Sequence, residues 1–312
     1  MLARFNHPYV LLFTSMVIGA ILNCLVNYYS KDRVKNAADN AFYSLCASAL
    51  TACVVAVFII GDGFNGISLF TLAMSAVFAL FTFSNYVIHI KALNLGPLAY
   101  TSIISSASSV IPALYGLIFL GEPITVWQIT GIILMLVSVF FSVEKEPEKK
   151  KASIRWLVWA LLNFLTVGAI GICQKIHHAS DSAAQLNEYL LLTFIFVFIY
   201  SLIYLLILKK KGVTVTSKPF RDKKVMTVLV FAGITTGLVN MLNMFLSGVF
   251  DAGLFFPVVN GGTVLATILL SVFLFKEKFS PRRWLGIGFG VLALCFLLGV
   301  VQSILGAFGI SA

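Results

Sequence analysis

Paired polar side chains, five amides and one imidazole, inside long apolar segments are the residues of this chain whose type and spacing could bind a ligand. The members of each pair are three or four residues apart, which places both on one face of a helix. The pairs are Asn23 with Asn27, Asn85 with His89, and Asn240 with Asn243. A carboxamide offers hydrogen-bond donors and acceptors without a net charge. The pairs are therefore candidate contacts for an uncharged or zwitterionic solute.

Two further polar positions extend this set. Asn260 follows Pro257 and precedes two glycines, and Gly and Pro interrupt membrane helices where the freed backbone groups line a cavity. Residues 256–262 are therefore the best candidate for an interrupted helix, and the favoured alternative is a kink needed for packing or rocking. Ser105 belongs to a stripe of small residues at helical spacing, a pattern that favours close helix packing over contact with a solute.

The same polar residues have a second explanation, in which they hold helices together. Polar groups deep in lipid are costly and face either the interior of a helix bundle or a water-filled cavity. A hydrogen bond between membrane helices stabilises by about 0.6 kcal/mol on average. Both interpretations stay open for each Asn. We prefer Asn85 and Asn240 as site residues because an internal repeat, described below, places them at equivalent positions.

Catalytic, metal and redox chemistry have little support in the sequence. The acidic residues Asp62, Glu122, Asp251 and Glu277 fall at the ends of apolar segments, and none is expected in the middle of one. The five cysteines lie inside apolar segments without a CxxC pair, as small buried hydrophobic residues do. No phosphate-binding GxxxxGK[ST] loop is present. We therefore expect no enzyme, no cofactor, no metal site and no direct use of ATP.

The elements that carry these residues are predicted to be membrane-spanning helices. The 312 residues are 60% hydrophobic and only 11% charged, whereas a soluble chain has about a quarter charged residues. One helical crossing of a bilayer takes roughly 20 apolar residues, which leaves room for ten crossings. The expected crossings are Pro8–Tyr29, Ala41–Ile60, Leu69–Ala92, Pro97–Leu120, Val126–Val143, Trp156–Lys175, Tyr189–Leu208, Val225–Gly248, Ala252–Phe275 and Trp284–Val301.

The distribution of basic residues predicts the orientation of these helices. Of the 22 Lys and Arg residues, all but Arg4 and Lys175 fall in loops on one side of the predicted bundle. Basic loops stay in the cytoplasm, so both termini are predicted to be extracytoplasmic, in a bacterial plasma membrane. The net charge of +10 thus serves orientation, and no nucleic-acid partner is expected.

The chain divides into two similar halves. Residues 1–143 and 156–305 each hold five predicted helices, and the charged stretch 144–155 joins them. A shift of 155 residues aligns Asn85 with Asn240 and Glu122 with Glu277. An odd number of helices inserts the halves in opposite senses, as in many secondary transporters. The predicted fold class is all-α: a polytopic membrane protein with ten helices in two inverted five-helix repeats.

The stretch KALNLGPLAYTSIISSASSVIPALYGLIFLGEPITVWQITGIILMLVSV (91–139) resembles the domain repeated in EamA-like members of the drug/metabolite transporter superfamily. The shared marks are Pro112, the turn at Glu122 and the later Gly131, and the second half repeats the pattern in FKEKFSPRRWLGIGFGVLAL (275–294). It departs in having Thr267 where the first half has Pro112. The resemblance implies a ten-helix carrier, of a class that often exports amino acids and other metabolites.

The leading hypothesis is a secondary transporter that exports a small polar metabolite, such as an amino acid, by alternating access. The alternatives are a translocator of a lipid-linked substrate and a drug or cation efflux carrier. The small four-helix relatives that expel cationic drugs depend on a carboxylate deep in the first helix, where this chain has Asn23 and Asn27. The expected partners are a small-molecule solute and membrane lipid, and we expect a monomer or a homodimer.

Overall fold

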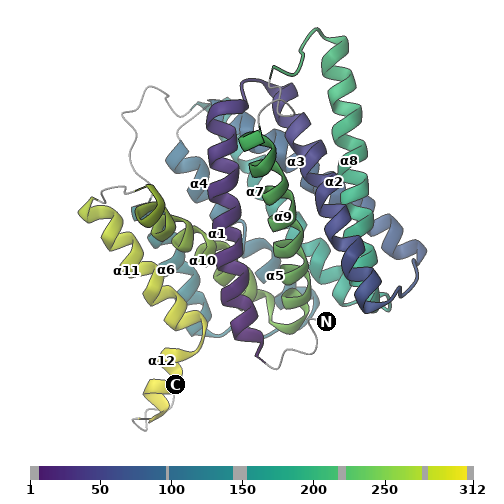
Figure 1. The fold of residues 1–312 in the computed structure, drawn as a ribbon. Helices are drawn as coiled ribbons and strands as arrows, with labels where there is room; N and C mark the ends of the chain where they lie inside the picture. The colour runs from purple at the N-terminus through teal and green to yellow at the C-terminus, as the bar shows by residue number, and fades with distance from the viewer. Residues whose placement is uncertain (1–6, 96–97, 143–152, 217–222, 276–279, 308–312) are drawn as a thin grey trace. The chain divides into compact units, whose positions relative to one another are not determined.

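The computed structural model describes residues 7–95, 98–142, 153–216, 223–275 and 280–307, and in these ranges the chain is helical without a strand (Figure 1). The predicted all-α class is confirmed. The helices are α1 (Pro8–Arg33), α2 (Ala37–Asp62), α3 (Leu69–Leu95), α4 (Leu98–Ala107), α5 (Val110–Phe119), α6 (Val126–Ser142), α7 (Ile154–His178), the short 3-10 helix η2 (Ala183–Gln185), α8 (Leu186–Lys210), α9 (Lys223–Val249), α10 (Ala252–Phe275), α11 (Pro281–Leu297) and α12 (Val300–Ala307).

Seven helices of the described ranges are long and apolar enough to cross a membrane. They are α1, α2, α3, α7, α8, α9 and α10. Two shorter apolar stretches, Ile104–Phe119 and Val126–Ser142, coincide with the fourth and fifth expected crossings. The arrangement as ten crossings in two inverted repeats therefore stays a prediction.

The chain forms two compact units that do not follow the two halves of the sequence. Unit 1 comprises Met1–Val87 and Ile176–Leu246, and unit 2 comprises Ile88–Lys175 and Ser247–Ala312. Each unit thus combines segments from both halves, with the changes of unit falling inside α3, α7 and α9. The division into repeats at 1–143 and 156–305 remains a prediction about the sequence.

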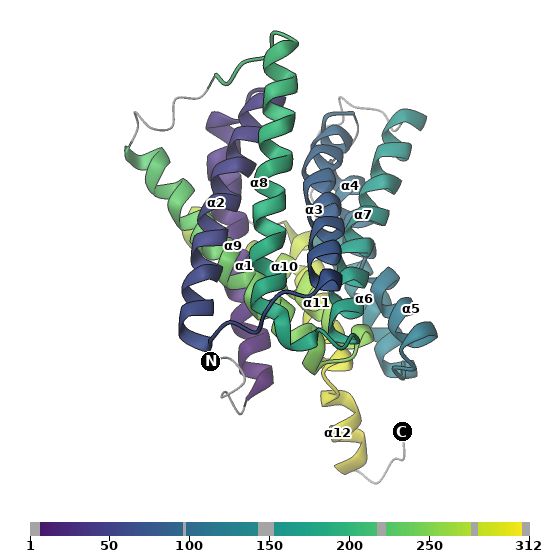
Figure 2. The ribbon, with the colours of Figure 1, turned by 90° about the vertical axis from the view of Figure 1, so that its right-hand side faces the viewer.

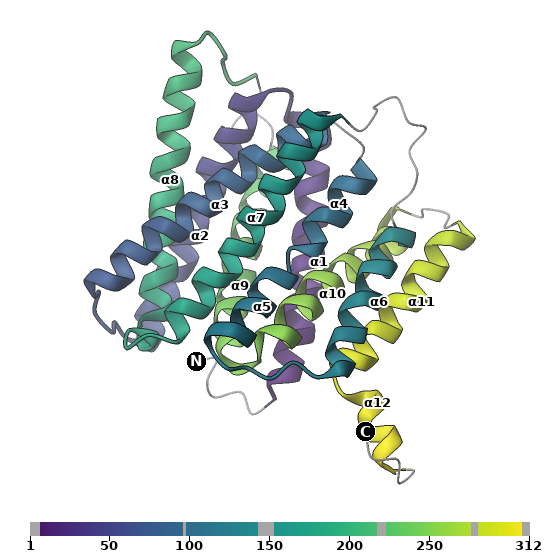
Figure 3. The same cartoon turned by 180° about the vertical axis from the view of Figure 1, so that it is seen from behind.

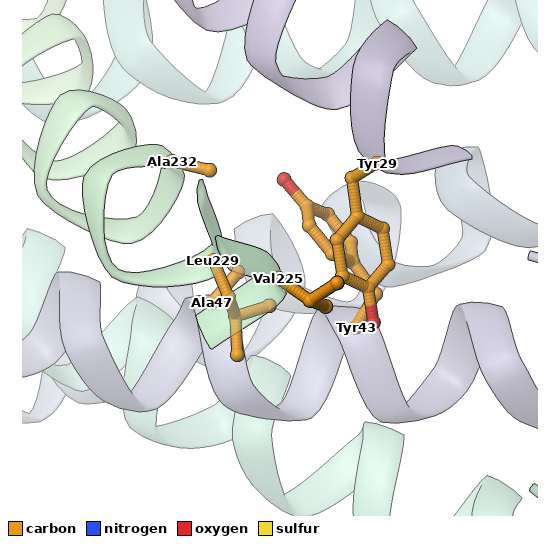
Figure 4. Packing of buried hydrophobic residues seen from close by; sticks show 6 residues of the cluster. All are labelled: Tyr29, Tyr43, Ala47, Val225, Leu229 and Ala232. Atoms are coloured by element: carbon orange, nitrogen blue, oxygen red, sulfur yellow. The ribbon is translucent and has the colours of Figure 1, made fainter. Parts of the chain in front are cut away.

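In unit 1, α2 and α8 lie side by side (Figure 2). A hydrogen bond of 2.9 Å between the hydroxyls of Ser44 and Ser201 joins them inside the unit. An apolar cluster beside them combines α1, α2 and α9, with the rings of Tyr29 and Tyr43 4.8 Å apart (Figure 4). Helix α9 approaches α2 closely, because Gly233 and Gly237 present no side chain there. Unit 1 thus positions α9 between other helices, and α9 carries two of the candidate site residues.

In unit 2, α6 and α11 lie side by side (Figure 3). The Ser138 hydroxyl donates to the Gly286 carbonyl at 2.7 Å, a bond that requires the two backbones to approach closely. Gly171 of α7 meets α5 in the same way, because a Cβ there would lie 2.8 Å from Cγ of Pro112. Small residues let membrane helices pack at short range, and these contacts fix α6 to α11 and α7 to α5.

A helix break lies between α4 and α5, whereas α10 is continuous. Pro112 lacks the N–H that would bond the Ser108 carbonyl, and its ring crowds that turn, so α4 ends at Ala107 and α5 begins at Val110. The hydroxyls of Ser108 and Ser109 donate to the carbonyls of Ser105 and Ser106, at 2.6 and 3.1 Å. They supply part of the bonding that the interrupted backbone loses.

The predicted interruption at residues 256–262 is wrong. Helix α10 runs without a break from Ala252 to Phe275, with Pro257 inside it. Pro257 is the sixth residue of α10 and removes the N–H that would bond the Gly253 carbonyl, yet the helix continues past it.

A buried ion pair joins three helices of unit 2. Lys175 near the end of α7 donates its Nζ to Glu122 Oε1 at 2.5 Å and to the Phe250 carbonyl at 2.9 Å. Glu122 Oε2 accepts the first N–H of α10, from Ala252, at 2.6 Å. Gly121, with a φ of +66°, makes the tight turn that returns the Glu122 N–H to the Gly116 carbonyl. Each charge lies at the helix end whose dipole favours it.

We predict that the ion pair is strongly coupled in stability. Lys175→Met leaves Glu122 without its counter-charge, which costs roughly 3–5 kcal/mol for a buried pair. The double variant Lys175→Met/Glu122→Gln removes both charges, so it should recover much of that loss. Thermal unfolding of the detergent-solubilised protein measures this cycle. Losses that simply add in the double variant would contradict the coupling, and Asp62→Asn, which changes an exposed carboxylate, serves as the control.

The fit of α7 against α5 gives a second prediction. Gly171→Ala places a methyl group within 2.9 Å of two atoms of the rigid Pro112 ring, so the helices must separate and the protein should lose about 1–3 kcal/mol. Gly288→Ala on α11 meets no atom within 4 Å and should be neutral, or stabilising by up to about 1 kcal/mol. Equal unfolding temperatures for the two variants would show that the close approach is absent.

Candidate functional site

Two amide side chains on α9 of unit 1 form the best-defined candidate site. Asn240 Nδ2 donates to the Thr236 carbonyl of its own helix at 2.9 Å. Asn243 Oδ1 accepts a short hydrogen bond from the Ser15 hydroxyl of α1. In the described part of the chain, neither Asn240 Oδ1 nor Asn243 Nδ2 has a hydrogen-bond partner. One turn of α9 therefore presents an unused acceptor and an unused donor.

The surroundings of this turn explain why the two amides are held in place. Thr235 and Thr236, just before Asn240, return their own hydroxyls to the carbonyls of Phe231 and Ala232 at 2.6 and 2.7 Å. Their donors are thereby used within α9 and do not compete for a ligand. Both asparagines are half-buried.

Asn85 and His89 lie one turn apart on α3, and their role as a pair in a site stays a prediction. Asn85 is half-buried on the part of α3 that belongs to unit 1, whereas His89 lies on the part that belongs to unit 2. The His89 ring is hydrogen-bonded to the side chain of Asn163 on α7, which is fully buried. Lys91 places its Nζ 4.5 Å from the centre of the Trp159 ring, between the same two helices. His89 therefore contributes to packing of α3 on α7.

Asn85 and Asn240 belong to the same compact unit. Whether they face a common cavity and contact the solute stays a prediction. The repeat alignment that makes Asn85 and Asn240 equivalent also stays a prediction.

The remaining predicted residues are distributed over both units. Asn23 and Asn27 lie on exposed positions of α1. Asn260 is half-buried on α10 of unit 2 and makes no hydrogen bond within the described ranges. The carbonyl of Ser105 accepts from both the N–H and the hydroxyl of Ser108, which places Ser105 at the turn between α4 and α5. Their contact with a solute stays a prediction.

The buried carboxylates Asp39 and Glu188 were not predicted from the sequence as candidate site residues. The structure starts α2 at Ala37 and α8 at Leu186, several residues before the expected Ala41 and Tyr189. Asp39 and Glu188 consequently lie in first helical turns, and both are 0% exposed. The signal was present, because an acidic residue is favoured in a first helical turn and Asn36 caps α2 by accepting the Asp39 N–H.

The two carboxylates differ in how far their oxygens are satisfied. Asp39 accepts hydrogen bonds on both oxygens, from Thr216 N at 2.7 Å on Oδ1 and from the Thr216 hydroxyl at 2.6 Å on Oδ2. Glu188 Oε1 accepts the Asn65 N–H at 2.6 Å. Glu188 Oε2 is buried and has no hydrogen-bond partner in the described ranges. The Asp39 carboxylate thus holds Thr216 against the start of α2. One oxygen of the Glu188 carboxylate, in contrast, has no such structural role.

The residues that the structure describes contain no set of side chains suited to bind a metal ion. No group of three or more His, Cys, Asp and Glu side chains comes together there.

Comparison with known proteins gives a family and a fold. Residues 7–143 match the model of the EamA-like transporter family. A crystal structure of a protein superposes with a TM-score of 0.71 at 11% sequence identity, covering 95% of this chain and 98% of its own. At that identity the likeness concerns the fold alone, and it extends over both halves. No curated protein matches the sequence.

The family match confirms the resemblance found in the sequence, and the apolar helices supply the membrane segments that such a protein needs. Residues 7–143 thus match an EamA-like transporter domain, and the chain has helices that are long and apolar enough to cross a membrane.

Proposed function

We propose that this transporter is a secondary carrier that exports a small zwitterionic or uncharged metabolite, such as an amino acid, by alternating access. The observation that carries the proposal is the turn of α9 on which Asn240 offers an unused acceptor and Asn243 an unused donor. Residues three apart on a helix lie about 5–6 Å from each other at Cβ. An amino acid can span that distance, with its ammonium group at Asn240 Oδ1 and its carboxylate at Asn243 Nδ2.

A neutral site of this kind suits a solute without net charge. An amide contact supplies direction and hydrogen bonding but does not compensate a full charge. A drug or cation efflux carrier would be better served by a carboxylate, and the buried carboxylates of unit 1, Asp39 and Glu188, lie in the first turns of their helices. A translocator of a lipid-linked substrate is not favoured by any described contact.

Orientation follows from the loops, with both termini outside the cytoplasm of a bacterial cell. Lys175 is one of two basic residues on the proposed extracytoplasmic side, where few basic residues are expected. Its charge is compensated by Glu122 at 2.5 Å, so it adds no free positive charge on that side. The exception to the positive-inside pattern therefore has a local cause, which supports the proposed orientation.

We predict that the same substitution has different effects on export at the two asparagines of α9, Asn240 and Asn243. Asn243→Asp replaces the donor by a negative charge that repels a solute carboxylate, so export should fall at least tenfold, as expected for loss of a bond of about 1.5–3 kcal/mol to a charged group. Asn240→Asp keeps the acceptor and strengthens it for an ammonium group, so export should persist. Mass spectrometry of metabolites released by cells that produce each variant measures the difference.

The control for this experiment is Thr227→Val, which removes an exposed hydroxyl on the same helix that bonds only to its own backbone. It should leave export unchanged. If Asn240→Leu and Asn243→Leu both release wild-type amounts, the two are packing residues. The solute contact must then be sought at Asn85, Asn23, Asn27 or Asn260.

The proposed orientation is tested with reporters. Alkaline phosphatase, which is active only outside the cytoplasm, should be active when fused after Ala312. Green fluorescent protein at the same position should be dark. A fusion truncated in the charged linker at residues 144–155 provides the control and should give the reverse result. A fluorescent fusion after Ala312 would overturn the orientation and the parity of ten crossings.

A further inference from the structure

The turn between α1 and α2 and the segment that follows α8 are joined at one end of unit 1 (Figure 1). Asn36 Nδ2 donates to the Thr214 carbonyl at 3.1 Å. The Asp39 carboxylate accepts the Lys35 N–H at 3.1 Å and, from Thr216, the N–H at 2.7 Å and the hydroxyl at 2.6 Å. We call these five residues the Asp39 clasp. A buried polar group that is satisfied in this way fixes the segments that supply its partners.

The end of α8 is shaped so that the chain can reach this clasp. The N–H groups of Gly212 and Val213 donate to the carbonyls of Lys209 and Leu208, both at 3.0 Å, which is the hydrogen-bonding pattern of a Schellman motif. Gly212 has a φ of +79°, a conformation that glycine adopts at little cost. Leu208 packs in one apolar cluster with Ala41 of α2. The chain therefore turns directly after α8 and lies against the start of α2.

The same fold concentrates positive charge at this end of unit 1. Lys35 and residues 209–211, which are all lysine, are exposed, and none of these four has an ion-pair partner in the described ranges. Lys211 is three residues from Thr214, so their Cα atoms are at most about 11 Å apart. The Asp39 carboxylate is 0% exposed and accepts the three hydrogen bonds given above. The surface around it thus carries four positive charges without a compensating carboxylate in the described ranges.

An exposed apolar stripe on α8 leads to these lysines. Leu202, Ile203, Leu206 and Ile207 are between 39% and 52% exposed, and their spacing of three and four residues places them on one side of the helix. The α8 span is long and apolar enough to cross a membrane, and it ends at Lys210. Basic residues at the end of such a span lie at the level of the lipid headgroups. The stripe and the lysines together therefore offer an apolar surface with a cationic end.

We propose that the Asp39 clasp holds these lysines as a binding site for an anionic phospholipid, with the phosphate at the lysines and an acyl chain along the α8 stripe. Lysine ammonium groups bind phosphate as point charges, which suits a headgroup of variable geometry. A free phosphate ion would satisfy the lysines but would leave the apolar stripe unused. The site involves none of the proposed solute contacts and is independent of the export function. Only its place in the cytoplasmic leaflet follows from the proposed orientation.

Thermal unfolding of the purified protein in detergent tests lipid binding. Phosphatidylglycerol, whose headgroup is anionic, should raise the unfolding temperature by about 2–4 °C once its concentration exceeds the dissociation constant about tenfold. Phosphatidylcholine with the same acyl chains, and inorganic phosphate at equal concentration, should not. Equal effects of the two lipids, or no effect of either, overturn the proposal. An equal effect of inorganic phosphate would assign the lysines to a free anion and would also overturn it.

Charge variants show whether the position of the lysines matters. Each basic residue near a membrane surface contributes about fivefold to the affinity for anionic lipid, so Lys210→Gln/Lys211→Gln should bind phosphatidylglycerol roughly 25-fold more weakly. Lys91→Gln/Arg155→Gln removes the same charge from exposed positions of unit 2 and should bind the lipid like the wild type. An equal loss in both variants would mean that net charge alone attracts the lipid, which overturns a localised site.

A charge-neutral variant tests the role of the clasp. Thr216→Val removes the hydroxyl that donates to Asp39 without altering any charge, so the segment after α8 is held less firmly and lipid affinity should fall severalfold. Thr214→Val is the matched control, because Thr214 contacts Asn36 through its carbonyl rather than its hydroxyl. Each variant is compared in phosphatidylglycerol and in phosphatidylcholine, so a lower stability of the variant itself does not affect the result. Unchanged affinity in Thr216→Val would overturn the role assigned to the clasp.

Lysine acetylation locates the bound lipid on the wild-type protein. In lipid nanodiscs, the headgroup should protect Lys35 and residues 209–211 from acetic anhydride when the bilayer contains phosphatidylglycerol, but not when it contains phosphatidylcholine alone. Lys91, whose Nζ lies 4.5 Å from the centre of the Trp159 ring, should be labelled equally in both bilayers. Equal protection of Lys91 would indicate a general effect of bilayer charge and would overturn the localised site.

Discussion

The cost of leaving a polar group unpaired away from water organises this structure. In hydrocarbon each unsatisfied backbone group costs several kcal/mol, which allows only segments that bond within themselves or with a neighbour. The helices follow from this constraint, and so do the contacts between them. Ser44 meets Ser201, Ser138 meets the Gly286 carbonyl, and Asp39 takes the backbone and hydroxyl of Thr216. Lys175 and Glu122 satisfy each other and the start of α10 at once.

The same constraint separates packing residues from candidate site residues. His89 is hydrogen-bonded to Asn163, and Ser105 is engaged in the turn between α4 and α5, so both contribute to the fold. Asn240 and Asn243 each use one end of the amide and keep the other unused. Glu188 uses one oxygen of two. Partial use is costly for folding alone.

Helix positions could be predicted from the sequence because apolar length alone determines them. The predicted segment Ala252–Phe275 coincides with α10. Helix ends were less predictable, since Asn36 and Asp39 extend α2 by a turn through capping rather than through hydropathy. The break was misplaced, since α10 continues through Pro257, whereas the chain turns between α4 and α5 just before Pro112. Hydrogen-bond partners such as Ser15 for Asn243 lie 228 residues apart, and a single sequence contains no signal for such a distance.

The broken segment of α4 and α5 has a consequence for how the protein enters the membrane. Each piece has 10 residues and measures roughly 15 Å, about half of a hydrocarbon core of about 30 Å. Neither piece is a complete insertion signal, so the translocon has to admit the two as one unit. The Ser108 and Ser109 hydroxyls bond the carbonyls of Ser105 and Ser106 at this turn, so the two pieces cross the turn with fewer unpaired backbone groups than an open break would leave.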